Sequence, residues 1–151
     1  YSLYMKKYIS NNFKIAFGQH SGVIDINKDK FELPRFPINE KYGEIKRFKS
    51  IINYFPLEYK KIYPEEKQLF KNTNPPNFKV EFFKEQKNLS NINCYSNEGD
   101  LWGKSKTNFV NNSLTIEFRA PFKPRRGRVN CSLNDNGKWR WFGVQFPIKK
   151  N

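Results

Sequence analysis

The stretch that decides the fold is Val129–Phe146, which reads VNCSLNDNGKWRWFGVQF. Apolar and polar residues alternate before the turn, and Asn134–Gly137 is the strongest turn signal in the chain. The residues after the turn are predicted to return as a partner strand, on which Trp139 and Trp141 share a face. Gly143 permits a β-bulge in that strand. The stretch therefore predicts a β-hairpin.

Shorter strands are predicted before this hairpin. Residues 79–82 and 92–95 alternate between apolar and polar side chains, and residues 107–110 and 114–118 flank a hairpin turn at Asn111–Ser113. About six short strands in roughly 75 residues argue for a small antiparallel sandwich or barrel.

The first third of the chain has a different pattern. Residues 1–12 have the apolar spacing of the end of an amphipathic helix, and residues 46–54 predict a second helix. Residues 13–17 alternate and predict a short strand that ends at Gly18. A helix followed by a strand with a Gly-rich end is typical of an α/β unit, where loops at the carboxyl ends of strands build the site.

Proline residues suggest the domain boundaries. Pro64, followed by two glutamates, predicts a short helix that ends near Lys71. The run Asn74–Asn77 reads NPPN and is the expected boundary. We therefore expect an α+β protein with three parts: the end of a distorted (β/α) barrel (1–55), a helical, proline-rich connector (56–77) and a β-sandwich-like domain (78–151).

Composition sets limits on the function. The chain has 151 residues and a net charge of +14, but its lysines are scattered, and Lys, Asn, Ile, Phe and Tyr are all abundant, as A/T-rich codons produce. We therefore do not expect nucleic acid as a partner. No apolar run approaches the roughly 20 residues of a membrane span. The chain begins in what reads as the second half of a helix, so we interpret it as the C-terminal piece of a longer protein.

The two cysteines occur in matched contexts. Cys94 and Cys131 each follow an apolar residue and an asparagine, and both lie in predicted strands. One cysteine on each of two strands could form a bridge. The alternative is a pair of small buried hydrophobic residues in a reduced protein.

The run Gly18–Gly22 contains His20, the single histidine of the chain, between Gln19 and Ser21, which are candidate binding residues. A lone histidine can be a general acid or base, a ligand or a satisfied polar group in a turn. Flanking glycines let the backbone approach a substrate closely. We expect no metal to be bound by this chain alone, since no second histidine, cysteine or carboxylate stands at ligand spacing.

Arg35 lies between two prolines in a segment predicted to be extended. A cleft-lining arginine can hold a carboxylate in one orientation through its forked donors. The alternative is a surface arginine on an edge strand.

The tail holds a second group of candidates: Arg126 and Arg128, with Trp139 and Trp141. These residues could form a platform for single-stranded nucleic acid, or they could stack on sugar rings while the arginines bind hydroxyl or acidic groups. In the simplest interpretation the tryptophans are core and the arginines rim the sheet.

Two segments together resemble a known family. Residues 16–24 (AFGQHSGVI) and 33–39 (LPRFPIN) resemble the closing segment of bacterial polysaccharide deacetylases of the NodB-like class. Residues 127–131 and 139–146 look like part of the small β-domain that some of those proteins carry after the barrel.

The resemblance implies a hydrolase that removes acetyl groups from a polysaccharide with the help of a divalent metal. The Asp-Asp and His-x-x-x-His motifs of that family are absent from this sequence. By the resemblance, they would lie in an upstream barrel portion of the same protein, the fragment alone would be inactive, and a secreted or cell-envelope location is suspected. His20 would then lie at the cleft edge, and Arg35 would orient a catalytic carboxylate.

Overall fold

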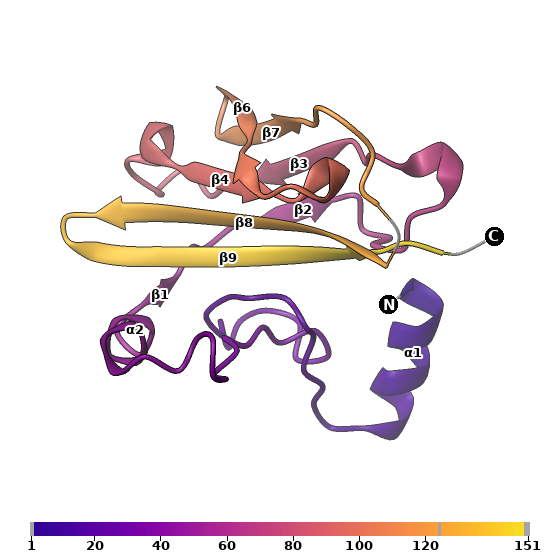
Figure 1. Ribbon diagram of the computed structural model, residues 1–151, viewed down its shortest axis with the longest axis horizontal. Helices are drawn as coiled ribbons and strands as arrows, with labels where there is room; N and C mark the ends of the chain where they lie inside the picture. The colour runs from indigo at the N-terminus through magenta and orange to yellow at the C-terminus, as the bar shows by residue number, and fades with distance from the viewer. Residues whose placement is uncertain (1, 124, 150–151) are drawn as a thin grey trace.

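The computed structural model describes residues 2–123 and 125–149, and the strands of the chain form two stacked β-sheets (Figure 1). The five-stranded sheet has the order β1-β9-β8-β4-β5, and the four-stranded sheet has the order β2-β3-β7-β6. Neighbouring strands are antiparallel except for β1 and β9, which are parallel. The mixed, β-rich α+β architecture agrees with the sequence prediction, and no closed barrel is found in the described residues.

The strands of the first sheet are β1 (Phe55–Pro56), β4 (Asn93–Ser96), β5 (Gly103–Lys104), β8 (Arg126–Asp135) and β9 (Lys138–Pro147). Those of the second are β2 (Lys61–Tyr63), β3 (Phe78–Glu81), β6 (Lys106–Val110) and β7 (Ser113–Glu117). The α-helices are α1 (Leu3–Asn12) and α2 (Ile45–Ile51), and short 3-10 turns are η1 (Lys71–Thr73), η2 (Leu89–Asn91) and η3 (Glu98–Asp100).

Both predicted hairpins are present. Asn136 and Gly137 form the two-residue turn between β8 and β9, and both have positive φ, at 51° and 85°. Two such residues give the turn twist that matches the twist of the strands. Asn111 and Asn112 have the same handedness between β6 and β7.

The bulge predicted at Gly143 is wrong. The register of β8 and β9 is continuous from Arg126 opposite Pro147 to Asp135 opposite Lys138, and Gly143 lies directly opposite Asn130. The glycine serves a different purpose, because another part of the chain passes over it, as described below.

The core lies between the two sheets. Alternate residues of β8 and β9 point inward, and so do Phe78 and Val80 on β3. Phe146 packs edge-to-face against Phe78, with ring centroids 6.0 Å apart. Burial of such an aromatic side chain contributes about 1.5–3 kcal/mol, and the core combines phenylalanines with leucine, isoleucine and valine residues.

Cys94 and Cys131 lie opposite each other on β4 and β8 and form a disulfide bond. Both are fully buried in the same core. Of the two alternatives that the sequence left open, the structure contains the bridge.

The helix predicted from Pro64 is wrong. These residues are irregular until η1, and Leu69 pairs with Ile148 in an isolated parallel bridge. The Leu69 amide donates to Pro147 O at 2.8 Å, and its side chain is buried. Burial and pairing with the chain end thus outweigh the local helix signal. The segment 56–77, predicted as a connector, contributes β2 to one sheet and Pro56, the second residue of β1, to the other.

Residues 2–54 lie on the outer side of the five-stranded sheet, away from the four-stranded one (Figure 1). Helix α1 begins after Ser2, whose hydroxyl accepts a hydrogen bond from the Met5 amide. The prediction that the sequence starts in the second half of a helix is therefore wrong, because Ser2 caps the first turn. The strand predicted at residues 13–17 is wrong, because its pairing is limited to an isolated parallel bridge between Phe17 and Leu33. Pro34 has no N–H with which to continue the pairing.

In the described part of the chain, no helix has both the length and the apolar character needed to span a membrane.

Candidate binding pocket

The Gly18–Gly22 run forms a compact loop next to Leu33. The Gly18 amide donates to Leu33 O at 2.8 Å, and the carbonyl of His20 accepts from the Arg35 amide at 3.1 Å. The imidazole folds back over Gly18, where an added Cβ would lie 2.5 Å from His20 Nδ1. Burial lowers the pKa of His20 below its usual 6.5, so the neutral ring is favoured.

Arg35 belongs to the same loop. Its side chain is exposed, and Nε donates to the carbonyl of Gly18 at 3.2 Å. Within the described residues it forms no ion pair with a carboxylate. In this chain Arg35 therefore holds the Gly18–Gly22 loop in place through this hydrogen bond. That Arg35 orients a catalytic carboxylate stays a prediction about a longer protein.

Gln19 and Ser21 connect this loop to the tail hairpin. Arg126 Nη1 donates to Gln19 Oε1 at 2.8 Å. The carbonyl of Ser21 crosses over Gly143, where an added Cβ would lie only 2.1 Å from that oxygen. Two groups of residues more than 100 positions apart are thus brought together, which the sequence analysis did not foresee.

The structure separates the tail arginines from the tryptophans. Arg128 lies opposite Gln145, four residues along β9 from Trp141, which is about 13 Å at the rise of a strand. Trp141 stacks on Tyr54 and packs edge-to-face against Phe36, whereas Trp139 is 43% exposed near the hairpin turn. Neither tryptophan belongs to the core between the sheets.

Arg128 has an aromatic neighbour that the sequence analysis missed. Its guanidinium carbon lies 5.1 Å from the ring centroid of Trp102, which precedes β5. Pairing of β4 with both β5 and β8 creates this proximity. No local pattern in the sequence indicates it.

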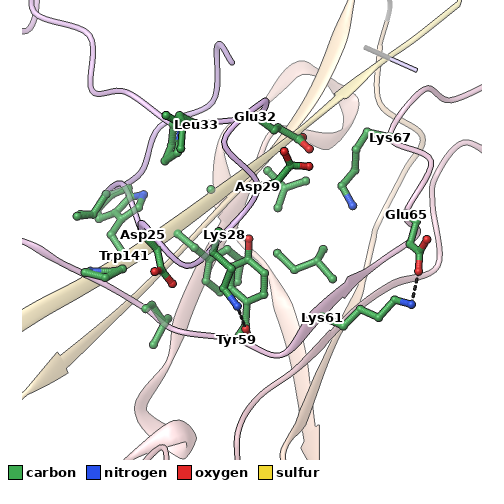
Figure 2. Close-up of a pocket in the computed structure, with 18 of the residues that line it drawn as sticks. Asp25, Lys28, Asp29, Glu32, Leu33, Tyr59, Lys61, Glu65, Lys67 and Trp141 are labelled. Atoms are coloured by element: carbon green, nitrogen blue, oxygen red, sulfur yellow. Dashed lines mark hydrogen bonds and ion pairs between the residues drawn. The ribbon is translucent and has the colours of Figure 1, made fainter. Parts of the chain in front are cut away.

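A pocket of about 330 Å³ lies where the N-terminal segment meets the two sheets (Figure 2). One wall comes from Lys6 and residues 23–34, the opposite wall from residues 56–67, and the remaining wall from Trp141–Val144 on β9. His20 does not line it, but the charges of Glu32, Lys67 and Lys6 act on that histidine. The pocket combines charged, polar and apolar side chains from three parts of the chain.

Lys6 is held by two carboxylates on one side of the pocket. Its amine forms ion pairs with Asp29 and with Glu32, the latter at 2.9 Å. Burial alone would lower the pKa of Lys6, but the hydrogen bonds from these carboxylates outweigh it and raise the pKa well above its usual value. Lys6 is therefore a fixed positive charge.

Lys67 lines the same pocket, and its amine points into it (Figure 2). The amine donates to the carbonyl of Pro64, and no carboxylate of the described residues lies within ion-pair distance. Burial lowers the pKa of Lys67. Two of its three N–H groups remain available for another acceptor.

Tyr59 forms part of the pocket wall between these charges. Burial raises the pKa of its phenol to about 12, so the hydroxyl stays protonated and can donate a hydrogen bond. Lys28 donates to the Tyr59 carbonyl, and its amine lies 4.5 Å from the centroid of the Tyr59 ring.

Acidic and basic side chains balance in the described lining. Four lysines and four carboxylates contribute to it, while Leu33, Trp141, Phe142 and Val144 supply apolar surface. The pocket therefore has little net charge on a chain whose total is +14. Such a site suits a neutral polar ligand better than a phosphate.

The described residues do not fit a resident divalent metal. No group of three or more His, Cys, Asp or Glu side chains converges in them, and both cysteines are in the disulfide. The carboxylates of Asp29 and Glu32 are already paired with Lys6. We derive no reaction step through a metal in this chain.

Comparisons with protein-family models, curated proteins and solved structures found no match for this chain. Assignment of a function therefore depends on the residues and the geometry described above.

Proposed function

We propose that the chain is the C-terminal part of a metal-dependent polysaccharide deacetylase. In this proposal residues 1–55 are the end of its distorted (β/α) barrel, and the β-sandwich is an accessory domain. The resemblance of residues 16–24 and 33–39 to the closing segment of NodB-like enzymes supports the assignment. So does the parallel bridge between Phe17 and Leu33, which follows a helix, as the last units of such a barrel would.

The observation that carries the proposal is the uncovered apolar surface of residues 2–54. Neither α1 nor α2 has a buried residue, and Tyr8 and Ile45 are 63% and 67% exposed. Phe13, Ile15 and Phe17 are also more than half exposed. Large apolar side chains that stay exposed in such number mark a site of interaction. We assign the upstream barrel portion of the same protein as the partner that covers it.

The division of roles follows from the residues present. When bound, the metal would activate water for attack on an acetyl carbonyl, and its ligands and the catalytic base belong to the upstream portion. This chain supplies one wall of the cleft, where the Gly18–Gly22 loop is fixed by Arg35. It also supplies polar and aromatic groups for the glycan.

The test is to express a longer protein that includes the residues encoded upstream of Tyr1. We expect an Asp-Asp motif followed by His-x-x-x-His, and metal-dependent release of acetate from acetylated oligosaccharides. The present chain should release none, and the longer protein with Asp-Asp replaced by Asn-Asn is the matched control. Upstream residues without these motifs, or acetate release by the present chain alone, would overturn the proposal.

A second candidate is a binding module for sugars or single-stranded nucleic acid. The stacked pair of Arg128 and Trp102, with Tyr95 46% exposed on β4, favours it. A salt titration separates the two ligands, since phosphate binding weakens steeply with salt and neutral glycan binding hardly changes. Unchanged binding of both ligands after Arg126→Ala with Arg128→Ala would contradict a role for these arginines.

A further inference from the structure

We infer that the pocket between the N-terminal segment and β9 is a glycan subsite that holds one neutral pyranose ring. The inference builds on the proposed function, since it assigns a place where this chain contacts the polysaccharide. The pocket is seen in the arrangement of the described residues, and no sequence motif indicates it.

The size of the pocket fits one ring. Its volume of about 330 Å³ is at the lower end of typical ligand sites, and it corresponds to roughly eleven water-sized groups. A hexopyranose has about that number of non-hydrogen atoms.

The polar groups of the pocket match hydroxyl groups. Lys67 has free N–H donors, and Tyr59 has a protonated phenol. The carboxylates of Asp29 and Glu32 keep lone pairs beyond those used by Lys6, and they line the same pocket as Lys67. A hydroxyl both donates and accepts, so it can bridge these two kinds of group, whereas a phosphate would meet carboxylates and be repelled.

The apolar lining supplies the other requirement. Leu33, Val144 and the indole of Trp141 lie along the pocket, and a pyranose has C–H faces that pack on such surfaces. Trp141 is already fixed by Tyr54 and Phe36, so its contribution needs no reordering on binding.

The experiment measures binding of a neutral N-acetylglucosamine tetramer to the full chain by calorimetry, with an oligothymidylate of similar length as the competing class. We expect the tetramer to bind with an affinity that changes little between about 50 and about 500 mM salt. Lys67→Met and Tyr59→Phe should each weaken it about fivefold or more through loss of a hydrogen bond. Lys84→Met, at an exposed position that does not line the pocket, should leave it unchanged.

A second readout locates the sugar independently of the variants. The indole N–H resonance of Trp141, identified by its loss in Trp141→Phe, should shift on addition of the tetramer, and that of Trp139 should not. The inference would be overturned if millimolar tetramer neither shifted the Trp141 resonance nor bound to the chain. It would also be overturned if Lys67→Met and Tyr59→Phe bound the tetramer with the same affinity as the unmodified chain. Preference for the oligonucleotide with a steep salt dependence would also overturn it.

Failure of this inference can be told apart from failure of the proposed function. If the longer protein releases acetate and the two pocket variants leave its KM unchanged, the subsite is wrong and the deacetylase stands. If the present chain binds the tetramer in the pocket while the longer protein lacks the motifs, the subsite stands and the deacetylase is wrong.

Discussion

The β-sandwich and residues 2–54 use similar apolar and aromatic residues in opposite ways. On β8 and β9 alternate side chains from Gly127 to Leu133 and from Phe142 to Phe146 are buried, because a second sheet covers their inner face. On α1 and α2 no residue is buried. The difference teaches that apolar patterning makes a core only where a second surface is available to cover it.

The two regions meet at an interface, called the seam below. Ser21 crosses Gly143, Trp141 stacks on Tyr54, and Arg126 binds Gln19. These contacts attach residues 2–54 to the outer face of a sandwich whose own core does not include them. We therefore expect the sandwich to supply most of the stability of the chain.

The largest expected effect is a difference in the free energy of unfolding between a substitution in the sandwich and one in residues 2–54. Phe146→Ala removes a fully buried ring and should lower the free energy of unfolding by about 3–5 kcal/mol. Phe13→Ala removes a ring that is 60% exposed and should change it by less than about 0.5 kcal/mol. Urea unfolding followed by circular dichroism measures both. Equal losses would show that the two regions fold as one cooperative unit.

The disulfide should also act on the sandwich alone. Cys94 and Cys131 are 37 residues apart, so their bond should stabilise the folded chain by about 3–4 kcal/mol through restriction of the unfolded state. A Cys94→Ala, Cys131→Ala double variant should lower the urea midpoint accordingly. Amide hydrogen exchange should become faster in β4 and β8 and stay unchanged in residues 2–54. An unchanged midpoint, or thiols that react in the native wild-type protein, would contradict the bridge.

Local signals explain the elements that could be predicted. The hairpins are specified by their own turn residues, such as Asn136 and Gly137, and α1 by its apolar spacing. The strand β3 at Phe78–Glu81 was also found, because alternation over a few residues is sufficient to indicate it. Each of these features depends on residues that are close in sequence.

The features that were predicted wrongly depend on residues that are distant in sequence. Gly143 looked like a bulge, but its missing side chain makes room for Ser21, more than 100 residues earlier. The helix predicted after Pro64 yields to the pairing of Leu69 with Ile148. The pocket itself combines Lys6, Glu32 and Lys67, which no spacing rule connects. Long-range packing decided all three, and a single sequence contains no direct record of it.

A smaller effect tests the seam. In Gly143→Ala the new Cβ would lie 2.1 Å from the Ser21 carbonyl and 2.7 Å from Asn130 Oδ1, so the N-terminal segment must move away. We expect faster amide exchange in residues 18–35 and unchanged protection of β8. The free energy of unfolding should fall by at most about 3 kcal/mol. Gly103→Ala is the matched control.

In that control the new Cβ would first meet the flexible end of Arg119, at 3.0 Å. Its effect on residues 18–35 should be absent. Faster exchange throughout β8 and β9 in Gly143→Ala would mean that the segment and the sandwich are not separable.

The smallest expected effect concerns the loop that the seam holds in place. Because burial lowers the pKa of His20, its NMR titration should have a midpoint below 6.5. The folded state then binds fewer protons than the unfolded state in this range. The stabilising contribution of neutral His20 is therefore complete above about 6.5 and is lost as the pH falls through the folded pKa.

His20→Gln keeps a polar side chain but cannot titrate, so it should remove this part of the pH dependence and leave that of the carboxylates. In Gly143→Ala, where the loop is displaced and more hydrated, the midpoint of His20 should move back toward 6.5. A midpoint at or above 6.5 in the wild-type chain would mean that His20 is not buried by the loop. The Gly18–Gly22 loop would then be hydrated without any substitution, and residues 2–54 would not be packed against the sandwich at the seam.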